Sequence, residues 1–229
     1  MEKPWIDWKL STKIAVNTTI LLLVIGTLGF YWLEQDNTLA DMNLTESLIT
    51  SFFQSATART AGFSTVDIGQ ITIPALVLMM FLMFIGGSSG STAGGIKTST
   101  FFLLVASVIA TSRGSSQVEV GKRHISRSVI FKALSIFFYG IAINLIGVFI
   151  LSISEPQLSL TDLTFELVSA SGTVGLSRGI TTSLSDVGKM VIIATMFLGR
   201  VGTLTFAIAL STQATSQNYK LPQEELMVG

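Results

Sequence analysis

The sequence has no cysteine, and its 229 residues include only one histidine and four prolines. The absence of cysteine excludes disulfides, thiol nucleophiles and thiolate metal ligands, and a lone histidine cannot form a multi-histidine metal site. Charged residues make up only 12%, about half of their usual share in soluble domains, whereas hydrophobic residues reach 49%. The formal net charge is zero, which gives no indication of a nucleic-acid partner. This composition favours an integral membrane protein.

Four long runs carry almost no charge. Residues 14–33 and 133–154 have none, and residues 190–210 have only Arg200. Each of these runs matches the roughly 20 apolar residues that a bilayer-spanning helix needs. Residues 71–112 would form a straight helix about 60 Å long, which is about twice the hydrocarbon thickness. We therefore expect this fourth run to bend or break as it crosses the membrane.

Charges between the runs indicate an orientation. Basic residues precede the first run and fill residues 113–132, whereas acidic residues cluster at 34–46 and 155–166. Because basic loops remain cytoplasmic, both basic segments are expected inside. We therefore predict a multi-pass protein of the cell membrane that crosses the bilayer four times and has both termini in the cytoplasm.

Two short uncharged segments, 47–58 and 167–177, follow the acidic clusters and are too short to span. Thr60-Ala61-Gly62-Phe63-Ser64 and Thr173-Val174-Gly175-Leu176-Ser177 share a Thr-x-Gly-apolar-Ser pattern. We predict an all-α integral membrane fold of two tandem helix–pore-loop–helix (M1-P-M2) repeats, K+-channel-like, with one broken transmembrane helix. The repeats would occupy residues 1–126 and 127–229, the second including a cytoplasmic C-terminal tail. Interfacial helices with ordinary glycine turns are the alternative.

A cation that sheds its water needs replacement oxygens, and aligned backbone carbonyls supply them without a fixed charge that would trap the ion. Glycine permits the dihedral angles that alignment requires, and the C-terminal end of each short helix adds a negative dipole. Candidate filter residues are Thr60, Ala61, Gly62, Phe63, Thr173, Val174, Gly175 and Leu176.

The long fourth run contains a glycine-rich stretch that should interrupt its helix, because glycine costs about 1 kcal/mol per helical position relative to alanine. The candidate gating residues are Gly86, Gly87, Ser88, Ser89, Gly90, Ser91, Thr92, Ala93, Gly94, Gly95 and Arg200. A passive helix kink is the alternative. A phosphate-binding loop does not fit, because Ile96 separates the glycines from Lys97 and no strand precedes them.

Arg200 lies in an apolar run, where a central arginine costs about 2.5–3.5 kcal/mol to insert. We expect it to face protein or water and to donate hydrogen bonds to carbonyls of the glycine-rich stretch. A static interhelical hydrogen bond is the alternative. Arg59 is expected to brace the first loop from behind, and Lys97 to sit toward the cytoplasmic end of the broken crossing. Near the outer mouth we expect solvated charges: Arg178, Asp67, Asp186 and Lys189.

These motifs together resemble the Ktr/Trk/HKT superfamily of potassium transport proteins. Residues 57–65 and 172–177 resemble its third and fourth filter loops, and 84–97 and 197–205 resemble its gating loop and the helix that faces it. Thr-Ala-Gly-Phe and Thr-Val-Gly-Leu favour the Ktr membrane subunit. The resemblance implies K+ as the transported ion, with glycine in each filter loop going with potassium preference and serine allowing Na+. It implies no organic cofactor.

Members of this superfamily carry four repeats in one chain, and this sequence matches the third and fourth. The resemblance therefore implies that the first and second repeats come from the same or a separate chain, or from a second copy. It further implies a homodimer of the complete subunit, a cytosolic nucleotide-binding regulatory subunit, and a docking surface at 113–132.

Two other functions are open to this sequence. Gly175-Leu176-Ser177-Arg178-Gly179 matches a serine-nucleophile pattern, but the only histidine, His124, is expected on the opposite side of the membrane. We therefore predict that the protein is not an enzyme. A non-conducting scaffold that binds partners is the second alternative, because two loops cannot surround an ion on four sides.

Overall fold

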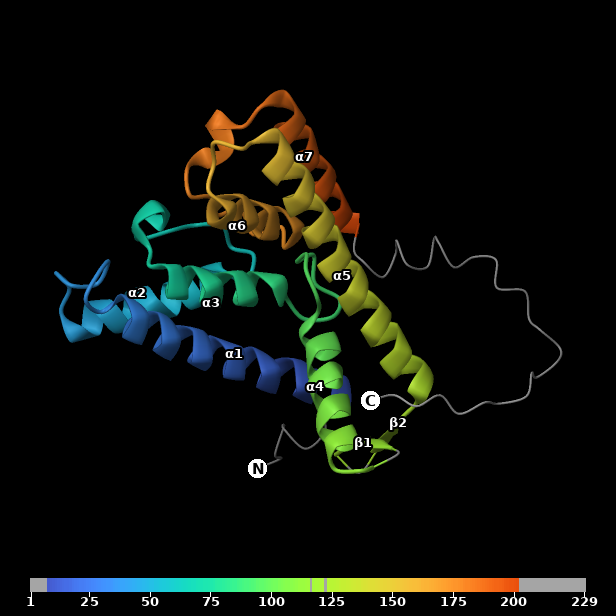
Figure 1. Cartoon of the computed structure of the whole chain (residues 1–229). Coiled ribbons are helices and arrows are strands. Elements are labelled where there is room, and N and C mark those ends of the chain that lie inside the picture. The colour runs from blue at the N-terminus through green and yellow to red at the C-terminus, as the bar shows by residue number, and fades with distance from the viewer. Residues whose placement is uncertain (1–7, 116, 122, 202–229) are drawn as a thin grey trace.

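The computed structural model describes residues 8–115, 117–121 and 123–201 (Figure 1). Seven helices follow one another within these residues: α1 (Leu10–Glu34), α2 (Leu44–Thr57), α3 (Ile73–Phe84), α4 (Thr98–Ser112), α5 (Arg127–Ser154), α6 (Leu160–Ser171) and α7 (Asp186–Val201). Two 3-10 helices, η1 (Ile68–Gln70) and η2 (Ile180–Ser183), precede α3 and α7. The part of the predicted run 190–210 that lies beyond Val201 is outside the described residues.

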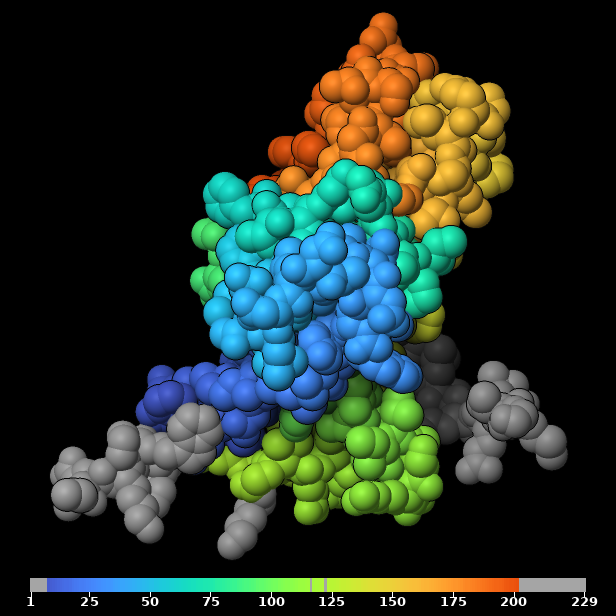
Figure 2. All heavy atoms as spheres, turned by 90° about the vertical axis from the view of Figure 1, so that its left-hand side faces the viewer, coloured from blue at the N-terminus to red at the C-terminus, as the bar shows by residue number. Residues whose placement is uncertain are grey.

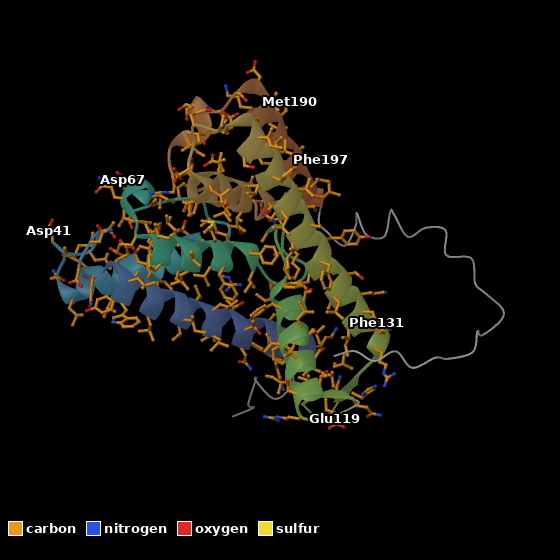
Figure 3. The ribbon with its side chains drawn as sticks, in the orientation of Figure 1. Asp41, Asp67, Glu119, Phe131, Met190 and Phe197 are labelled. Atoms are coloured by element: carbon orange, nitrogen blue, oxygen red, sulfur yellow. The ribbon has the colours of Figure 1, made fainter. Side chains whose placement is uncertain are left out.

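Two of the described helices, α1 and α5, are long and apolar enough to cross a membrane. Only 22% of the apolar window of α1 and 17% of that of α5 is buried. On α5, Phe131 and Phe138 are each 65% exposed, and Figure 3 shows Phe131 projecting away from the other helices. A soluble protein rarely exposes so much contiguous apolar surface, so these faces are suited to lipid or to other apolar helices. α3 and α4 are shorter apolar helices.

The order of elements recurs along the chain. We call α1–α4 the first half and α5–α7 the second half. In each half a long helix is followed by a short helix, a 3-10 helix and a further apolar helix. α1 packs on α2 and α3, and α5 packs on α6 and α7, while α6 contacts α3 across the halves (Figure 1). In Figure 2 the orange part of the second half lies above the blue and cyan part of the first half.

Matching residues position the long helix of each half. Gly26 and Gly147 lie the same distance before Glu34 and Glu155. A side chain at Gly26 would meet Ser55 Oγ of α2 at 2.2 Å, and one at Gly147 would meet Leu167 Cδ2 of α6 at 2.7 Å. Glycine at both positions therefore allows the long helix to pack closely on its short helix.

Glu34 and Glu155 join the C-terminal end of each long helix to the start of α3 and of α7, respectively. Glu34 is fully buried, and its carboxylate accepts hydrogen bonds from Thr72 N at 2.8 Å and Thr72 Oγ1 at 2.6 Å. Glu155 is also buried and accepts from Ser185 N at 2.9 Å and from the Ser185 hydroxyl. Sequence analysis placed both carboxylates among the acidic outer loops, whereas they are buried and hydrogen-bonded within the fold.

Glu34→Ala is expected to destabilise the protein by about 2 kcal/mol, because hydrogen bonds to a charged acceptor are each worth about 1.5–3 kcal/mol and buried donors would lose their partner. The melting temperature in detergent measures this loss. Asp36→Ala removes an exposed carboxylate two residues away and should leave the melting temperature nearly unchanged. Equal effects of the two substitutions would contradict a structural role for Glu34.

The hydrogen bond from the Ser185 side chain, followed by those from its backbone N–H and from Gln157, lowers the pKa of Glu155 below its ordinary value of 4.5. A carboxylate with a lowered folded-state pKa stabilises the fold above its unfolded pKa and loses that contribution as the pH falls. The difference in melting temperature between the unmodified protein and Glu155→Ala should therefore be full at neutral pH and shrink below pH 4.5. A difference that stays constant down to acidic pH would contradict this, and Asp41→Ala, at an exposed position, provides the baseline.

Two predicted boundaries were wrong. The second short segment was expected over 167–177, but α6 begins at Leu160 and thus includes Asp162 and Glu166. Ser159 caps this helix by accepting a hydrogen bond from Asp162 N at 3.1 Å. α2 likewise begins at Leu44 rather than 47, because Asn43 and Glu46 form a capping box. In both cases a capping signal in the sequence could have identified the start.

The fold is not entirely helical. Residues 118–125, which sequence analysis treated as part of a basic loop, contain the antiparallel strands β1 (Val118–Val120) and β2 (Arg123–Ile125). Val118 pairs with Ile125 and Glu119 with His124. Gly121 has a φ of +56°, which helps the chain reverse between the strands. In Figure 3 Glu119 lies at the bottom of the molecule, away from Asp41 and Asp67 at the left.

Candidate functional site

Two turns follow the C-terminal ends of the short helices, and we call them the first turn (58–64) and the second turn (172–177). They share an unusual backbone. Thr60 and Gly62 have φ values of +77° and +80°, and Thr173 and Gly175 have +54° and +91°. A positive φ is rare for a β-branched residue, so each turn holds a strained threonine two residues before its glycine. From the sequence this conformation was expected for the glycines alone, and the threonines were not predicted to adopt it.

Different contacts hold the two turns. In the first turn, the hydroxyl of Thr57 accepts a hydrogen bond from Phe63 N at 3.0 Å and donates one to Phe63 O at 2.5 Å. In the second turn, Val174 N donates to Ser169 O at 2.9 Å, which folds the chain back on the end of α6. Ser171, at that end, donates from its hydroxyl to Asn144 Oδ1 at 3.0 Å. Each turn is thus fixed by its own short helix or by the long helix beside it.

The two turns meet at their glycines. A side chain at Gly62 would meet Val174 O at 2.6 Å, and one at Gly175 would meet Gly62 Cα at 3.5 Å. The backbones of the predicted filter residues therefore lie in contact, although they are more than 100 residues apart in the sequence. Their side chains diverge, since that of Leu176 is buried in the core while Phe63 is 72% exposed.

The glycine-rich stretch lies between α3 and α4, and we call residues 85–97 the glycine-rich loop. It is non-helical, and its two ends are joined, because Ile96 N donates to Phe84 O at 2.9 Å and Ile85 bridges to Ile96. A side chain at Gly86 would meet Gly94 O at 1.9 Å, so glycine is required where the two arms approach. The tip is open, with nothing within 4 Å of the position that a side chain at Gly90 would take.

The glycine-rich loop contacts the second turn directly. Gly94 N donates a hydrogen bond to Thr173 Oγ1 at 2.8 Å. Three cationic side chains also donate to carbonyls of the loop: Arg200 to Thr92 O at 2.5 Å, Arg59 to Gly86 O at 3.2 Å, and Lys97 to Ser91 O at 3.1 Å. The loop is therefore bonded to the second turn at Gly94 and held by side chains from α7 and from the first turn.

These contacts concern two residues singled out in the sequence. Lys97 was expected toward the cytoplasmic end of the broken crossing, and its side chain folds back onto the loop, where it also donates to Ala93 O. Arg59 was expected to brace the first turn. Its guanidinium donates to Thr19 O of α1 at 3.3 Å and to Gly86 O, so this first-turn residue is tied to α1 and to the glycine-rich loop.

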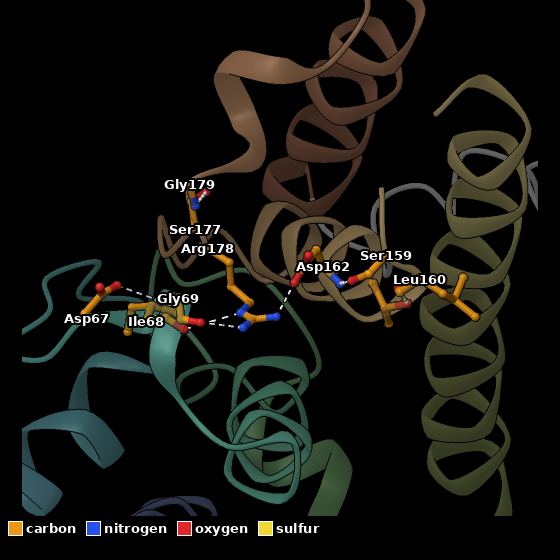
Figure 4. A network of polar contacts seen from close by, with 10 residues as sticks. Asp67, Ile68, Gly69, Ser159, Leu160, Asp162, Ser177, Arg178 and Gly179 are labelled. Atoms are coloured by element: carbon orange, nitrogen blue, oxygen red, sulfur yellow. Dashed lines mark hydrogen bonds and ion pairs between the residues drawn. The ribbon is translucent and has the colours of Figure 1, made fainter. Parts of the chain in front are cut away.

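Arg178 was treated as a solvated charge, but it is engaged in contacts with both halves (Figure 4). It forms an ion pair with Asp162 and donates to the carbonyl oxygens of Ile68 and Gly69. Its position directly after the second turn was visible in the sequence, but its acceptors in the first half were not.

The site offers backbone carbonyl and hydroxyl oxygens rather than an acidic metal cage. Within residues 8–201, leaving aside 116 and 122, no group of three or more histidines and carboxylates could hold a metal ion. Ser177, the nucleophile of the hydrolase alternative, pairs its hydroxyl with Thr181 and accepts from Gly179 N, whereas His124 lies in β2.

Comparisons with known proteins agree with the fold. Residues 7–221 match the TrkH family, whose description is cation transport protein. The potassium/sodium uptake protein NtpJ of Enterococcus hirae is 40% identical over 226 residues, which cover 96% of this chain and 50% of that relative. The Ktr system potassium uptake protein B of Bacillus subtilis is 39% identical over 224 residues, covering 97% of this chain and 50% of the relative.

A solved structure is also similar. The crystal structure of the potassium transporter TrkH from Vibrio parahaemolyticus matches with a TM-score of 0.70 at 20% identity, over 86% of this chain and 44% of that one. The chain thus spans about half the length of the curated relatives it matches. These relatives are transport proteins, which confirms the prediction that the chain is not an enzyme and the resemblance found in its motifs. The chain therefore belongs to the TrkH family of cation transport proteins, which are membrane proteins.

Proposed function

We propose that this chain forms half of a potassium-selective pathway through the cell membrane. The observation that carries the proposal is the meeting of two turns with the same unusual backbone, each at the end of a short helix. Peptide oxygens from Thr60 to Phe63 and from Thr173 to Leu176 would replace the water shell of K+. Relatives named for potassium or for potassium/sodium uptake support this choice of ion, with Na+ as a second cargo.

Helix direction supports cation binding at the turns. α2 and α6 end at Thr57 and Ser171, directly before the two turns. The C-terminal end of a helix carries a partial negative charge, equivalent to about half an elementary charge. Two such ends near one site favour a cation there without a carboxylate that would bind it too tightly.

In this proposal the chain consists of two helix–pore-loop–helix repeats and crosses the membrane four times. The crossings are α1, the interrupted pair α3 and α4, α5, and α7 with the residues that follow it. α3 and α4 have 12 and 15 residues, about 18 and 22 Å of helix, so together they suit one broken crossing. Asp41 and Asp67 would face outside and the basic segment 113–132 the cytoplasm, with both termini inside.

The glycine-rich loop is proposed as the gate. Its contact with Thr173 places it against the second turn, and Arg200 holds the loop carbonyl of Thr92. A loop anchored by a few hydrogen bonds can move aside when they break, whereas a continuous helix cannot. The positive charge of Arg200 would also oppose a cation that leaves the filter.

Two further filter turns are needed to surround an ion, and we propose that they come from two repeats of the same kind, in the same or a separate chain. The complete subunit would dimerise and bind a cytosolic nucleotide-binding regulatory subunit at the basic segment 113–132. A non-conducting scaffold is the second candidate, because the described residues contain two such turns rather than four.

Flux into liposomes tests the proposal. The chain is purified with and without a co-expressed partner that carries the other two repeats, its assembly size is measured in detergent, and K+ uptake is followed in proteoliposomes. We expect uptake only from the assembly that contains four turns, and stronger uptake for K+ than for Na+. A four-turn assembly of the correct size that passes no cations would favour the scaffold instead.

A further inference from the structure

Arg178 is the first residue after the second turn, and its side chain reaches into the first half of the chain (Figure 4). Nε donates a hydrogen bond to Ile68 O at 3.3 Å, and Nη2 donates to Gly69 O at 2.6 Å. Nη1 forms an ion pair with Asp162. One guanidinium therefore binds a carboxylate and two backbone carbonyls from different parts of the chain.

Each acceptor has a defined place beside the turns. Ile68 and Gly69 belong to η1, which connects the first turn to α3. Asp162 lies near the N-terminal end of α6, and the C-terminal end of this helix leads into the second turn. Arg178 thus joins the exits of both turns to the start of the second short helix.

The chemistry of the contact requires arginine. A guanidinium presents its donors in a rigid planar fork and can serve three acceptors at once, whereas a lysine ammonium is a point charge on a flexible stem. The side chains are partly shielded from solvent, at 18% exposed for Arg178 and 23% for Asp162, so water competes less for these hydrogen bonds than at an open surface.

The first half has no counterpart to this contact. Thr65 holds the same place after Gly62 that Arg178 holds after Gly175. Its hydroxyl accepts a hydrogen bond from Gln54 Nε2 at 3.1 Å, within its own half. Of the two residues at this matched position, only Arg178 therefore forms hydrogen bonds with the other half.

We propose that Arg178 is a positioning residue for ion selectivity, which fixes the second turn relative to the first. The inference rests on the proposed function, because selectivity has meaning only if ions pass the turns. A filter made of carbonyl oxygens discriminates by the number and spacing of those oxygens, and functional groups need positioning to within about 0.5 Å. Loss of the Arg178 contacts frees η1 and the exit of the second turn to move independently.

The test uses the complete four-turn assembly with three variants. Arg178→Met keeps an unbranched side chain but removes all three contacts, and Arg178→Lys keeps the charge but not the planar fork. The control is Lys189→Met, which removes an exposed charge near the N-terminal end of α7. Two readouts are measured: the K+ to Na+ permeability ratio in proteoliposomes, and hydrogen–deuterium exchange of residues 66–71, which lie in the other half.

We expect Arg178→Met to lower the permeability ratio by about tenfold or more, the change that loss of one charge-assisted hydrogen bond gives, and to speed exchange at 66–71. Arg178→Lys should be intermediate and Lys189→Met unchanged. Three results would each overturn the inference. In Arg178→Met, exchange at 66–71 could be faster while the permeability ratio is unchanged, or exchange could be unchanged. Lys189→Met could also change the permeability ratio as much as Arg178→Met does. If the unmodified assembly passes no cations, the proposed function itself fails and the selectivity role fails with it, whatever the exchange data show.

Discussion

Gly62→Ser is expected to reduce discrimination of K+ over Na+ by at least about tenfold in the complete assembly, because it acts on the two turns at once. The φ of Gly62 is +80°, a conformation that L side chains rarely adopt. The new Cβ would also lie 2.6 Å from Val174 O, closer than real Cβ contacts come. Because that atom belongs to the backbone of the second turn, the two turns must move apart.

Growth at low K+ with excess Na+ measures this effect. A potassium-uptake-deficient strain that carries the complete assembly should grow poorly at low K+ with excess Na+ when Gly62 is replaced. Gly114→Ser is the matched control, since Gly114 has a φ of +71° but nothing within 4 Å of its side-chain position, and lies beyond α4. Equal growth of Gly62→Ser and the unmodified assembly would contradict a filter role for the first turn.

Arg200→Ala is expected to raise cation flux through the same assembly about tenfold. Arg200 donates to Thr92 O at 2.5 Å from α7, across to the glycine-rich loop. A charged donor contributes about 1.5–3 kcal/mol to such a contact, and 1.4 kcal/mol corresponds to a tenfold change in an equilibrium. Loss of the contact therefore shifts the loop toward its displaced position, and loss of the positive charge lowers the barrier below the filter.

Proteoliposome flux at matched protein density checks this expectation. Arg200→Lys keeps the charge with a different donor geometry, so it separates the hydrogen bond from the electrostatic barrier. Lys189→Ala removes an exposed cationic side chain of the same helix, α7, and should leave flux unchanged. Unchanged flux in Arg200→Ala, with normal expression and assembly, would indicate a static interhelical contact instead.

The sequence predicted those features that depend on local composition. Uncharged runs identified α1 and α5, and the shared Thr-x-Gly pattern brought together Gly62 and Gly175, whose backbones lie in contact. Such signals are readable because membrane insertion depends on the hydrophobicity of contiguous residues, and because glycine marks close backbone approach.

Features that depend on distant partners could not be predicted. Glu34 reads as an outer acidic residue, and only its donor Thr72, far along the chain, reveals its burial. Arg178 likewise finds its acceptors in η1 of the other half. Hydrogen-bond partners of this kind are set by tertiary packing, which leaves no periodic trace in the sequence.

Strained residues were missed for a different reason. Thr60 and Thr173 adopt positive φ values that threonine disfavours locally, so propensity argues against them. Surrounding structure must hold them, and such strain is concentrated at functional sites. The matched positions of the two threonines are therefore stronger evidence for a functional turn than either glycine alone.

A density map of the complete assembly, recorded in K+ and again in Rb+ or Tl+, tests the central claim most directly. The account predicts ordered monovalent cations shared by the backbone oxygens of Thr60 to Gly62 and Thr173 to Gly175, with density that strengthens for the heavier ion. Turns whose carbonyls face away from a common axis, with no cation between them, would contradict it.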